Sequence, residues 1–333
     1  MNRTGEQSMR TFAHFNAQTV DEAVAILQRY GDRAQIMAGG TDLLGKMKDE
    51  ILPGYPEAIV NLKSIAGLDY IREDQDGLKI GALTRLEDIA THPAVGRHYQ
   101  ALAEAAGRAA SPHLREMGTL GGNVCQDIRC WYYRHPHNRF PCLRKGGGRC
   151  YAMEGENRYH SIFGGTVQDG CYAVHPSDTA PALIALGAGV NTSKRTLEAE
   201  ELFDIKVNGT TVLDADEIVI DFAIPRPPAG ARSTFVKFAL RKTIDFPIVN
   251  CAALISTEDD RVTAAVICLN AVYVRPYRAA RAEEYMLGQP INDATAESAG
   301  QAVVAEAEPL EHNAYMVQIA KTMVKRTILG CAG

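Results

Sequence analysis

The chain has 333 residues, of which 46% are hydrophobic and 23% are charged, and its net charge is −5 at pH 7. This composition allows a core of normal size spread over two or three domains, and the mildly acidic balance excludes nucleic acid as a general partner. Charge, glycine or proline interrupts every apolar run, so we expect no membrane span.

The N-terminal part is predicted to form a small α/β unit. Residues 1–8 are expected to be a flexible leader, and a first subdomain then runs from about 9 to 65. Thr19, with a glutamate three residues later, forms a capping box that opens a helix. Short apolar strands are expected at residues 34–38 and 58–62, and the first of them runs directly into a glycine loop.

A second subdomain is expected at about residues 66–228. A hairpin around Asp76-Gly77 opens it, and helices are predicted at 86–91, 101–110 and 179–186. A proline-rich linker at 224–230 ends it. Residues 229–333 should then form a smaller domain, with three strands followed by two helices. The fold class is therefore α+β.

Two glycine loops carry the first chemical signal. Ala38-Gly39-Gly40-Thr41-Asp42 follows a strand and precedes a helix, and Gly118-Thr119-Leu120-Gly121-Gly122-Asn123 offers the same chemistry. Glycine lets backbone N–H groups approach a phosphate without a Cβ in the way. Neither loop has the G-x-G-x-x-G pattern, so an ordinary NAD site is not indicated. Two loops in separate α/β units favour a dinucleotide pyrophosphate held between them.

These loops resemble the two FAD-contacting segments in the flavin subunits of the xanthine oxidase family of molybdenum hydroxylases. The resemblance covers nearly the whole chain. It implies an FAD-binding domain of the PCMH type at residues 9–228 and a CO dehydrogenase flavoprotein-like C-terminal domain at 229–333. The FAD contacts that it implies are Ile36, Met37, Ala38, Gly39, Gly40, Thr41, Asp42, Leu43, Leu44, Thr119, Leu120, Gly121, Gly122, Asn123, Asp178, Val219 and Lys237. Without it, Asp178 reads as a helix N-cap and Lys237 as a solvated strand lysine.

Five of the eight cysteines crowd an insertion at about residues 124–174. Cys130, Cys142, Cys150 and Cys171 are separated by 11, 7 and 20 residues, which is unlike the close C-x-x-C pairs of zinc ribbons. A [4Fe–4S] cluster tolerates such spacing, because each corner iron takes one thiolate. Clustered cysteines in a chain of this size indicate metal binding before disulfides.

Charge in the insertion favours the same reading. No carboxylate occurs between Ile128 and Met153, whereas six arginines and lysines do. Cations near a four-thiolate cluster stabilise its negative charge and tune its potential. A basic patch that docks an acidic carrier is a compatible alternative, and a four-thiolate zinc site remains open.

The resemblance is strongest to the [4Fe–4S]-containing flavin subunits of aldehyde oxidoreductase and 4-hydroxybenzoyl-CoA reductase. It implies Cys130, Cys142, Cys150 and Cys171 as cluster ligands, with Cys125 in reserve. No catalytic residue beyond the flavin is expected, because no Cys/His or Ser/His pair has a suggestive spacing.

The implied role is that of an electron-transfer subunit in an oxidoreductase complex. Partner subunits would carry the molybdenum cofactor and the [2Fe–2S] clusters in a hetero-oligomer, of which a dimer of heterotrimers is one form. Ferredoxin or another carrier would exchange electrons with it. A stand-alone flavin oxidoreductase with a structural zinc loop is the alternative. Residues 1–12 lack a signal-peptide core, so we expect a cytoplasmic chain, or a periplasmic one only if a signal-bearing partner exports it.

Overall fold

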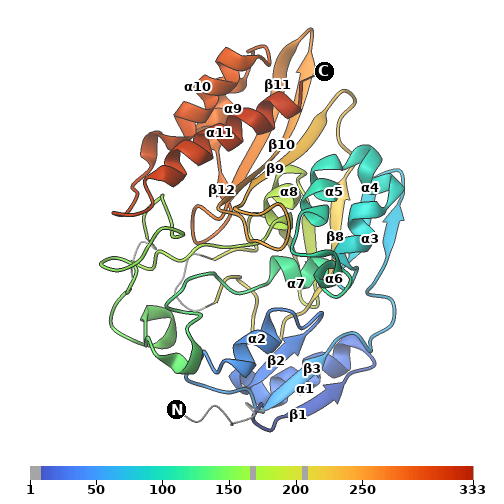
Figure 1. Ribbon diagram of the computed structural model, residues 1–333. Coiled ribbons are helices and arrows are strands. Elements are labelled where there is room, and N and C mark those ends of the chain that lie inside the picture. The colour runs from blue at the N-terminus through green and yellow to red at the C-terminus, as the bar shows by residue number, and fades with distance from the viewer. Residues whose placement is uncertain (1–8, 166–169, 205–208, 333) are drawn as a thin grey trace.

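The computed structural model describes residues 9–165, 170–204 and 209–332, so the leader expected at 1–8 lies outside the described residues. Three sheets follow one another along the chain, and Figure 1 shows them from the blue N-terminal unit below to the orange and red C-terminal unit above. The mixture of helices and sheets confirms the α+β expectation.

The N-terminal unit is a three-stranded parallel sheet in the order β1-β3-β2, covered by a helix. Its elements are β1 Ala13–Asn16, α1 Val20–Tyr30, β2 Ala34–Met37, α2 Leu43–Lys48 and β3 Ala58–Asn61. Thr19 caps α1 as predicted, since its side chain accepts a hydrogen bond from the N–H of Glu22 at 3.1 Å. The helix buries Leu27 against Val60 of the central strand.

The second unit is a five-stranded antiparallel sheet in the order β4-β5-β8-β6-β7. Its strands are β4 Ile71–Glu73, β5 Gly77–Gly81, β6 Gly189–Thr192, β7 Thr196–Glu198 and β8 Val219–Pro225. Its helices are α3 Leu86–Thr91, α4 Pro93–His98, α5 Gln100–Gly107, α6 Pro112–Arg115, α7 Leu120–Val124 and α8 Thr179–Ala185. Strands from both sides of the cysteine insertion therefore share this sheet.

The C-terminal sheet has four strands in the order β12-β11-β10-β9, where the sequence predicted three. The elements are β9 Arg232–Phe238, β10 Val249–Glu258, β11 Arg261–Asn270, β12 Tyr277–Arg278, α9 Ala280–Met286, α10 Asp293–Val303 and α11 Tyr315–Gly330. The missed strand, β12, has only two residues, which is too short to show an alternating pattern.

Both faces of the C-terminal sheet are covered. On β10, Cys251 and Ala253 face the core under α10 and α11, whereas Ala252 belongs to the core of the second unit. Successive strand residues point to opposite faces, so β9 likewise presents Phe235 to the second unit and Val236 to the helices. This alternation directs Lys237, which shares the face of Phe235, toward α8.

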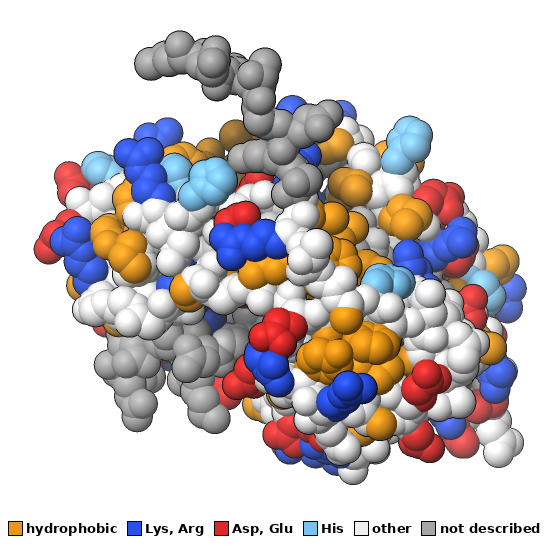
Figure 2. Space-filling model, turned by 90° about the horizontal axis from the view of Figure 1, so that it is seen from below, with side chains coloured by type: hydrophobic (Ala, Val, Ile, Leu, Met, Phe, Trp, Pro, Cys, Tyr) orange, Lys and Arg blue, Asp and Glu red, His pale blue; other side chains and the backbone are white. Residues whose placement is uncertain are grey.

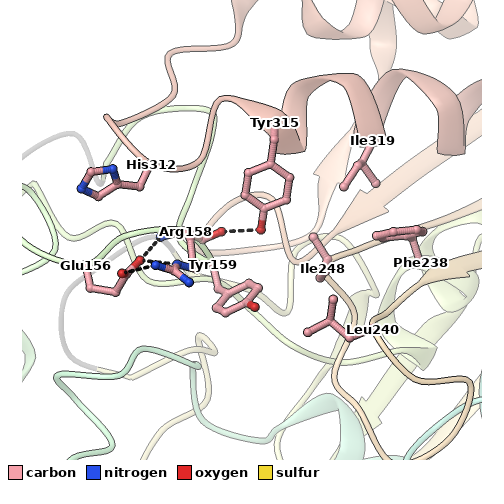
Figure 3. A pocket seen from close by; sticks show the side chains of 9 residues that line it. All are labelled: Glu156, Arg158, Tyr159, Phe238, Leu240, Ile248, His312, Tyr315 and Ile319. Carbon is pink, nitrogen blue, oxygen red and sulfur yellow. Dashed lines mark hydrogen bonds and ion pairs between the residues drawn. The ribbon is translucent and has the colours of Figure 1, made fainter.

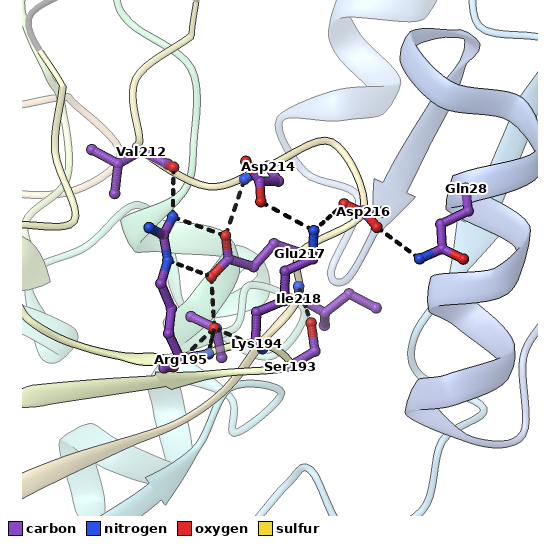
Figure 4. A network of polar contacts seen from close by, with 10 residues as sticks. Gln28, Ser193, Lys194, Arg195, Val212, Asp214, Asp216, Glu217 and Ile218 are labelled. Carbon is purple, nitrogen blue, oxygen red and sulfur yellow. Dashed lines mark hydrogen bonds and ion pairs between the residues drawn. The ribbon is translucent and has the colours of Figure 1, made fainter.

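A polar network joins the first two units (Figure 4). Gln28 of α1 donates to Asp216 at 2.9 Å. Lys194 forms ion pairs with both Asp216 and Asp214. Arg195 pairs with Glu217, whose side chain is fully buried. These contacts fix the loops of the five-stranded sheet against α1.

Acidic and basic side chains are interspersed on the face seen from below, and they edge an apolar patch at the lower right of the view (Figure 2). None of the helices among the described residues is long and apolar enough to span a membrane. These features agree with the unremarkable composition of the chain.

Candidate functional site

The first glycine loop is built for close approach. A Cβ on Gly39 would lie 2.1 Å from the carbonyl oxygen of Met117, which immediately precedes the second glycine loop. Gly40 has a φ of +73°, a conformation that other residues rarely adopt. Gly122 of the second loop faces the Ala38 side chain of the first. The two loops, 80 residues apart in the sequence, therefore lie against each other.

Free donors are concentrated in the first loop. Among the described residues, no acceptor is found for the backbone N–H groups of Gly39, Gly40 and Thr41. Gly39 and Gly40 are partly buried and Thr41 is exposed, so a ligand can reach these groups, and a row of such donors can bind an anion. The α2 helix that follows has only six residues, so the loop amides contribute more than a helix dipole does.

The second loop differs from the sequence-based expectation that both loops offer the same chemistry. The N–H groups of Leu120 and Gly121 donate to the carbonyls of Thr84 and Ala82, and that of Gly122 donates to the Thr119 side chain. Its glycines instead allow close packing. The backbone donors of the second loop are therefore occupied, whereas those of the first loop are not.

Asn123, at the end of the second loop, ties it to α8. Its side-chain oxygen accepts hydrogen bonds from the hydroxyls of Ser177, at 2.6 Å, and Thr179, at 2.7 Å. Ser177 in turn accepts from the N–H of Ala180, so Ser177 caps the start of α8. Asp178 occupies the N-cap position of α8, as the alternative reading has it, but its carboxylate makes no capping hydrogen bond.

Asp178 and Lys237 form a buried ion pair. The Lys237 Nζ lies 2.8 Å from the Asp178 carboxylate, and the two side chains are 7% and 5% exposed. The alternative reading of Lys237 as a solvated lysine is therefore also wrong. Asn250 donates to the other carboxylate oxygen at 2.8 Å, while its own amide oxygen has no partner in the described chain. Burial raises the pKa of Asp178, although Lys237 and Asn250 oppose the rise.

The remaining predicted contacts lie around this core. Ile36 and Met37 end β2, Leu43 and Leu44 open α2, and Val219 opens β8 with its side chain buried. Asp42 turns to the cysteine insertion, where it pairs with two arginines.

The insertion leaves and re-enters the second unit at one place. Arg129 and Val174 exchange two backbone hydrogen bonds across its neck, of 3.0 and 3.3 Å. Between them the described chain forms no α-helix or β-strand, only two short 3₁₀ turns at Pro136–Asn138 and Leu143–Lys145. Figure 1 shows this green segment running between the N-terminal and C-terminal units.

Four cysteines of the insertion line one cavity. They are Cys130, Cys142, Cys150 and Cys171, the four that were predicted as ligands. Cys125 is not among the lining residues, and packs instead at the edge of the core of the second unit. Burial raises the pKa of Cys130 to about 12, so binding of iron would have to displace its proton.

Nitrogen donors and buried cations border this cavity. Nε2 of His160 lies 3.2 Å from the Cys130 sulfur, and Arg144 donates from Nε to the Cys171 sulfur at 3.2 Å. Arg144 and Lys145 are only 9% and 8% exposed, yet the Arg144 Nη2 and the Lys145 Nζ have no hydrogen-bond partner within the described residues. Arg144 bonds a thiol and the Gly209 carbonyl, and Lys145 lies over the Tyr133 ring, but neither pairs with a carboxylate among the described residues. A buried cation without an anionic partner is costly, so the arrangement favours a negatively charged group beside them.

Among the described residues, no three His, Cys, Asp or Glu side chains are placed to hold a single metal ion. A zinc site would bring its thiolates to about 2.3 Å from one centre.

A separate open pocket of about 600 Å³ lies at the start of α11 (Figure 3). Tyr159, Phe238 and Tyr315 contribute apolar surface, and Arg158 pairs with Glu156 at its rim. None of the predicted flavin contacts or cysteines lines it.

The geometry has counterparts among known proteins. The family model described as the FAD binding domain in molybdopterin dehydrogenase matches residues 10–227, and the CO dehydrogenase flavoprotein C-terminal domain matches residues 234–331. The chain belongs to the FAD-binding subunits of the molybdenum hydroxylases. Proteins of this family are subunits of oxidoreductases, and so is this flavin subunit.

Individual relatives match along almost their full length. The FAD-binding subunit PaoB of an Escherichia coli (strain K12) aldehyde oxidoreductase is 32% identical over 94% of this chain and 96% of its own. The nicotinate dehydrogenase FAD-subunit of Eubacterium barkeri is 27% identical over 87% of this chain and 84% of its own. A carbon monoxide dehydrogenase structure from Hydrogenophaga pseudoflava superposes with a TM-score of 0.77 at 25% identity, covering 97% of this chain and 98% of that one.

Sequence reasoning missed several residues of the site. His160 and Asn250 were not singled out, because a lone histidine and a strand asparagine carry no spacing signal. Their positions beside Cys130 and Asp178 result from contacts between residues 30 and 72 positions apart.

Proposed function

We propose that this flavin subunit holds a [4Fe–4S] cluster beside its FAD and transfers electrons between partner subunits and an external carrier. The observation that carries the proposal is the cavity lined by four cysteines and bordered by Arg144 and Lys145, two buried cations with unused donors. A four-thiolate cluster carries the negative charge that two buried cations beside four cysteines favour.

The proposed flavin contacts follow from the glycine loops. The free amides of Gly39, Gly40 and Thr41 would hold the pyrophosphate, with the second loop as the opposite wall. The unpartnered amide oxygen of Asn250 would accept a hydrogen bond from the nucleotide, close to the Asp178–Lys237 pair. When bound, FAD supplies the two-electron chemistry, and these residues orient it and exclude water.

The proposed cluster ligands are Cys130, Cys142, Cys150 and Cys171. Arg144 would donate to one ligand sulfur and contribute positive charge, and His160 would donate to another. Hydrogen bonds and charges near the sulfurs are recognised means of setting a cluster's potential. A four-thiolate zinc site is the alternative, and metal analysis of the purified chain distinguishes the two.

We further propose partners that carry the molybdenum cofactor and the [2Fe–2S] clusters, and a one-electron carrier such as ferredoxin. The relatives are subunits of an aldehyde oxidoreductase, a nicotinate dehydrogenase and a carbon monoxide dehydrogenase. We also propose two domains, at residues 9–228 and 229–333, which limited proteolysis would test. We propose a cytoplasmic location, which cell fractionation would test.

Cofactor content tests the proposal. We expect the anaerobically purified chain to contain about one FAD and about four irons. Cys142→Ser and Cys150→Ser should remove the iron while retaining FAD at saturating concentration, and Cys125→Ser should keep both. Zinc in place of iron, or iron that survives loss of Cys142, would contradict the cluster assignment.

A further inference from the structure

Asp42 lies where the first glycine loop meets the cysteine insertion. One carboxylate oxygen accepts from Nη1 of Arg129 and from Nη1 of Arg134, each at 2.8 Å. The other oxygen accepts from the backbone N–H of Asp127 at 3.0 Å. The two guanidinium groups hold the pKa of Asp42 well below its usual range, despite burial. Asp42 follows Thr41 directly, so its position fixes the last of the free loop amides.

A second ion pair lies one turn along α2. Lys46 Nζ is 3.0 Å from the Asp127 carboxylate, and the Tyr133 hydroxyl donates to the same oxygen at 2.6 Å. The lysine and aspartate side chains are 13% and 15% exposed. Water therefore screens this ion pair less than it screens an exposed one, and exposed ion pairs contribute little to stability.

Backbone and apolar contacts continue the same interface. The N–H of His137 donates to the carbonyl of Asp49 at 2.8 Å. Ile51 is fully buried in a small core with Tyr133, Cys142 and Cys171. The segment from Asp42 to Ile51 thus has one end at the flavin loop and one side against the residues that carry the cysteines.

We propose that Asp42 is a positioning residue that couples loading of the cluster to binding of FAD. The inference rests on the proposed function. The insertion has little regular structure, so a bound cluster would order it, and ordered Arg129 and Arg134 would hold Asp42 and the adjoining loop amides in place. Such coupling is reciprocal, so FAD would equally stabilise the cluster.

The test compares FAD affinity of the full chain with the cluster present and after anaerobic removal of iron by a chelator. In the wild type we expect the dissociation constant to rise roughly 5- to 150-fold when iron is removed. Asp42→Asn removes the charge but keeps the shape. In this variant the dissociation constants for FAD without and with iron should differ by no more than about twofold. Arg139→Ala should keep the wild-type ratio, because Arg139 is exposed on the insertion and contacts Phe140 rather than the flavin loop.

A second readout is hydrogen exchange at the α2 amides, which should be faster in the iron-free wild type and insensitive to iron in Asp42→Asn. If that variant does not fold, Arg134→Gln serves instead. If the wild type binds both FAD and iron, but its FAD dissociation constant is the same with and without iron, the coupling is overturned. A variant that keeps the wild-type ratio overturns the role of Asp42. Failure of the wild type to bind FAD or iron at all would contradict the proposed function instead.

Discussion

Replacing Lys237 with methionine tests the buried ion pair beside the proposed flavin site. The wild-type Nζ lies 2.8 Å from the Asp178 carboxylate, and both side chains are less than 10% exposed. Removing one partner of a buried pair costs about 3–5 kcal/mol, against about 0–1 kcal/mol at a surface. Because Asn250 still donates to the carboxylate, we expect the lower end, about 3 kcal/mol of the free energy of unfolding.

The loss should depend on pH. Burial already raises the pKa of Asp178 above its ordinary 3.8, and loss of Lys237 raises it further. A raised carboxyl pKa favours the folded state at low pH, and this contribution is lost as the pH rises through the folded pKa. The deficit of Lys237→Met should therefore be larger at pH 8 than at pH 5.

Urea denaturation of the FAD-free chain, followed by circular dichroism at both pH values, measures this deficit. The matched control is Asp178→Asn combined with Lys237→Met, which removes both charges and should recover at least about half of the loss. A deficit below about 1 kcal/mol, or one that is equal at the two pH values, would refute the assignment of a buried charge pair.

Three further predictions concern the loops, the cluster and the C-terminal helices. Gly39→Ala should weaken FAD binding at least roughly tenfold, measured by flavin fluorescence, because the new Cβ would force the two loops apart; Gly45→Ala, with no atom within 4 Å of its Cβ, is the control. Arg144→Gln should lower the midpoint potential of the proposed cluster by roughly 50–150 mV in an EPR titration, since a nearby unit charge is worth a few kcal/mol at an effective dielectric of about 20. An unchanged potential would contradict the charge role of Arg144. Gly300→Ala should lower the free energy of unfolding, measured by urea denaturation, by about 1–3 kcal/mol, because its Cβ would lie 2.6 Å from the Lys321 carbonyl of α11. An unchanged free energy of unfolding would contradict close packing of α10 on α11.

Contiguous signals predicted much of the fold. The α1 cap at Thr19, the strand that enters the Gly39-Gly40 loop and the helix at Thr179–Ala185 are read from neighbouring residues, whose conformation depends on local sterics and hydrogen bonds. The four cysteines that the sequence groups together line one cavity, and their role as ligands stays a prediction. Short elements such as β12 gave no such pattern.

The sequence by itself determined which residue types the chain offers: two glycine loops, an insertion rich in cysteine and arginine, and a strand lysine. Only the tertiary structure decided how they are used. The backbone N–H groups of the second loop donate to the carbonyls of Thr84 and Ala82. Asp42 pairs with two arginines that are 87 and 92 residues away in the sequence. Of the basic residues in the insertion, Arg129 and Arg134 pair with Asp42 of the first glycine loop. Arg144 and Lys145 lie beside the cysteines. A hydrogen-bond donor or a charge is local to its residue, but its partner is set by chain topology, which is why composition predicted the groups and not their pairing.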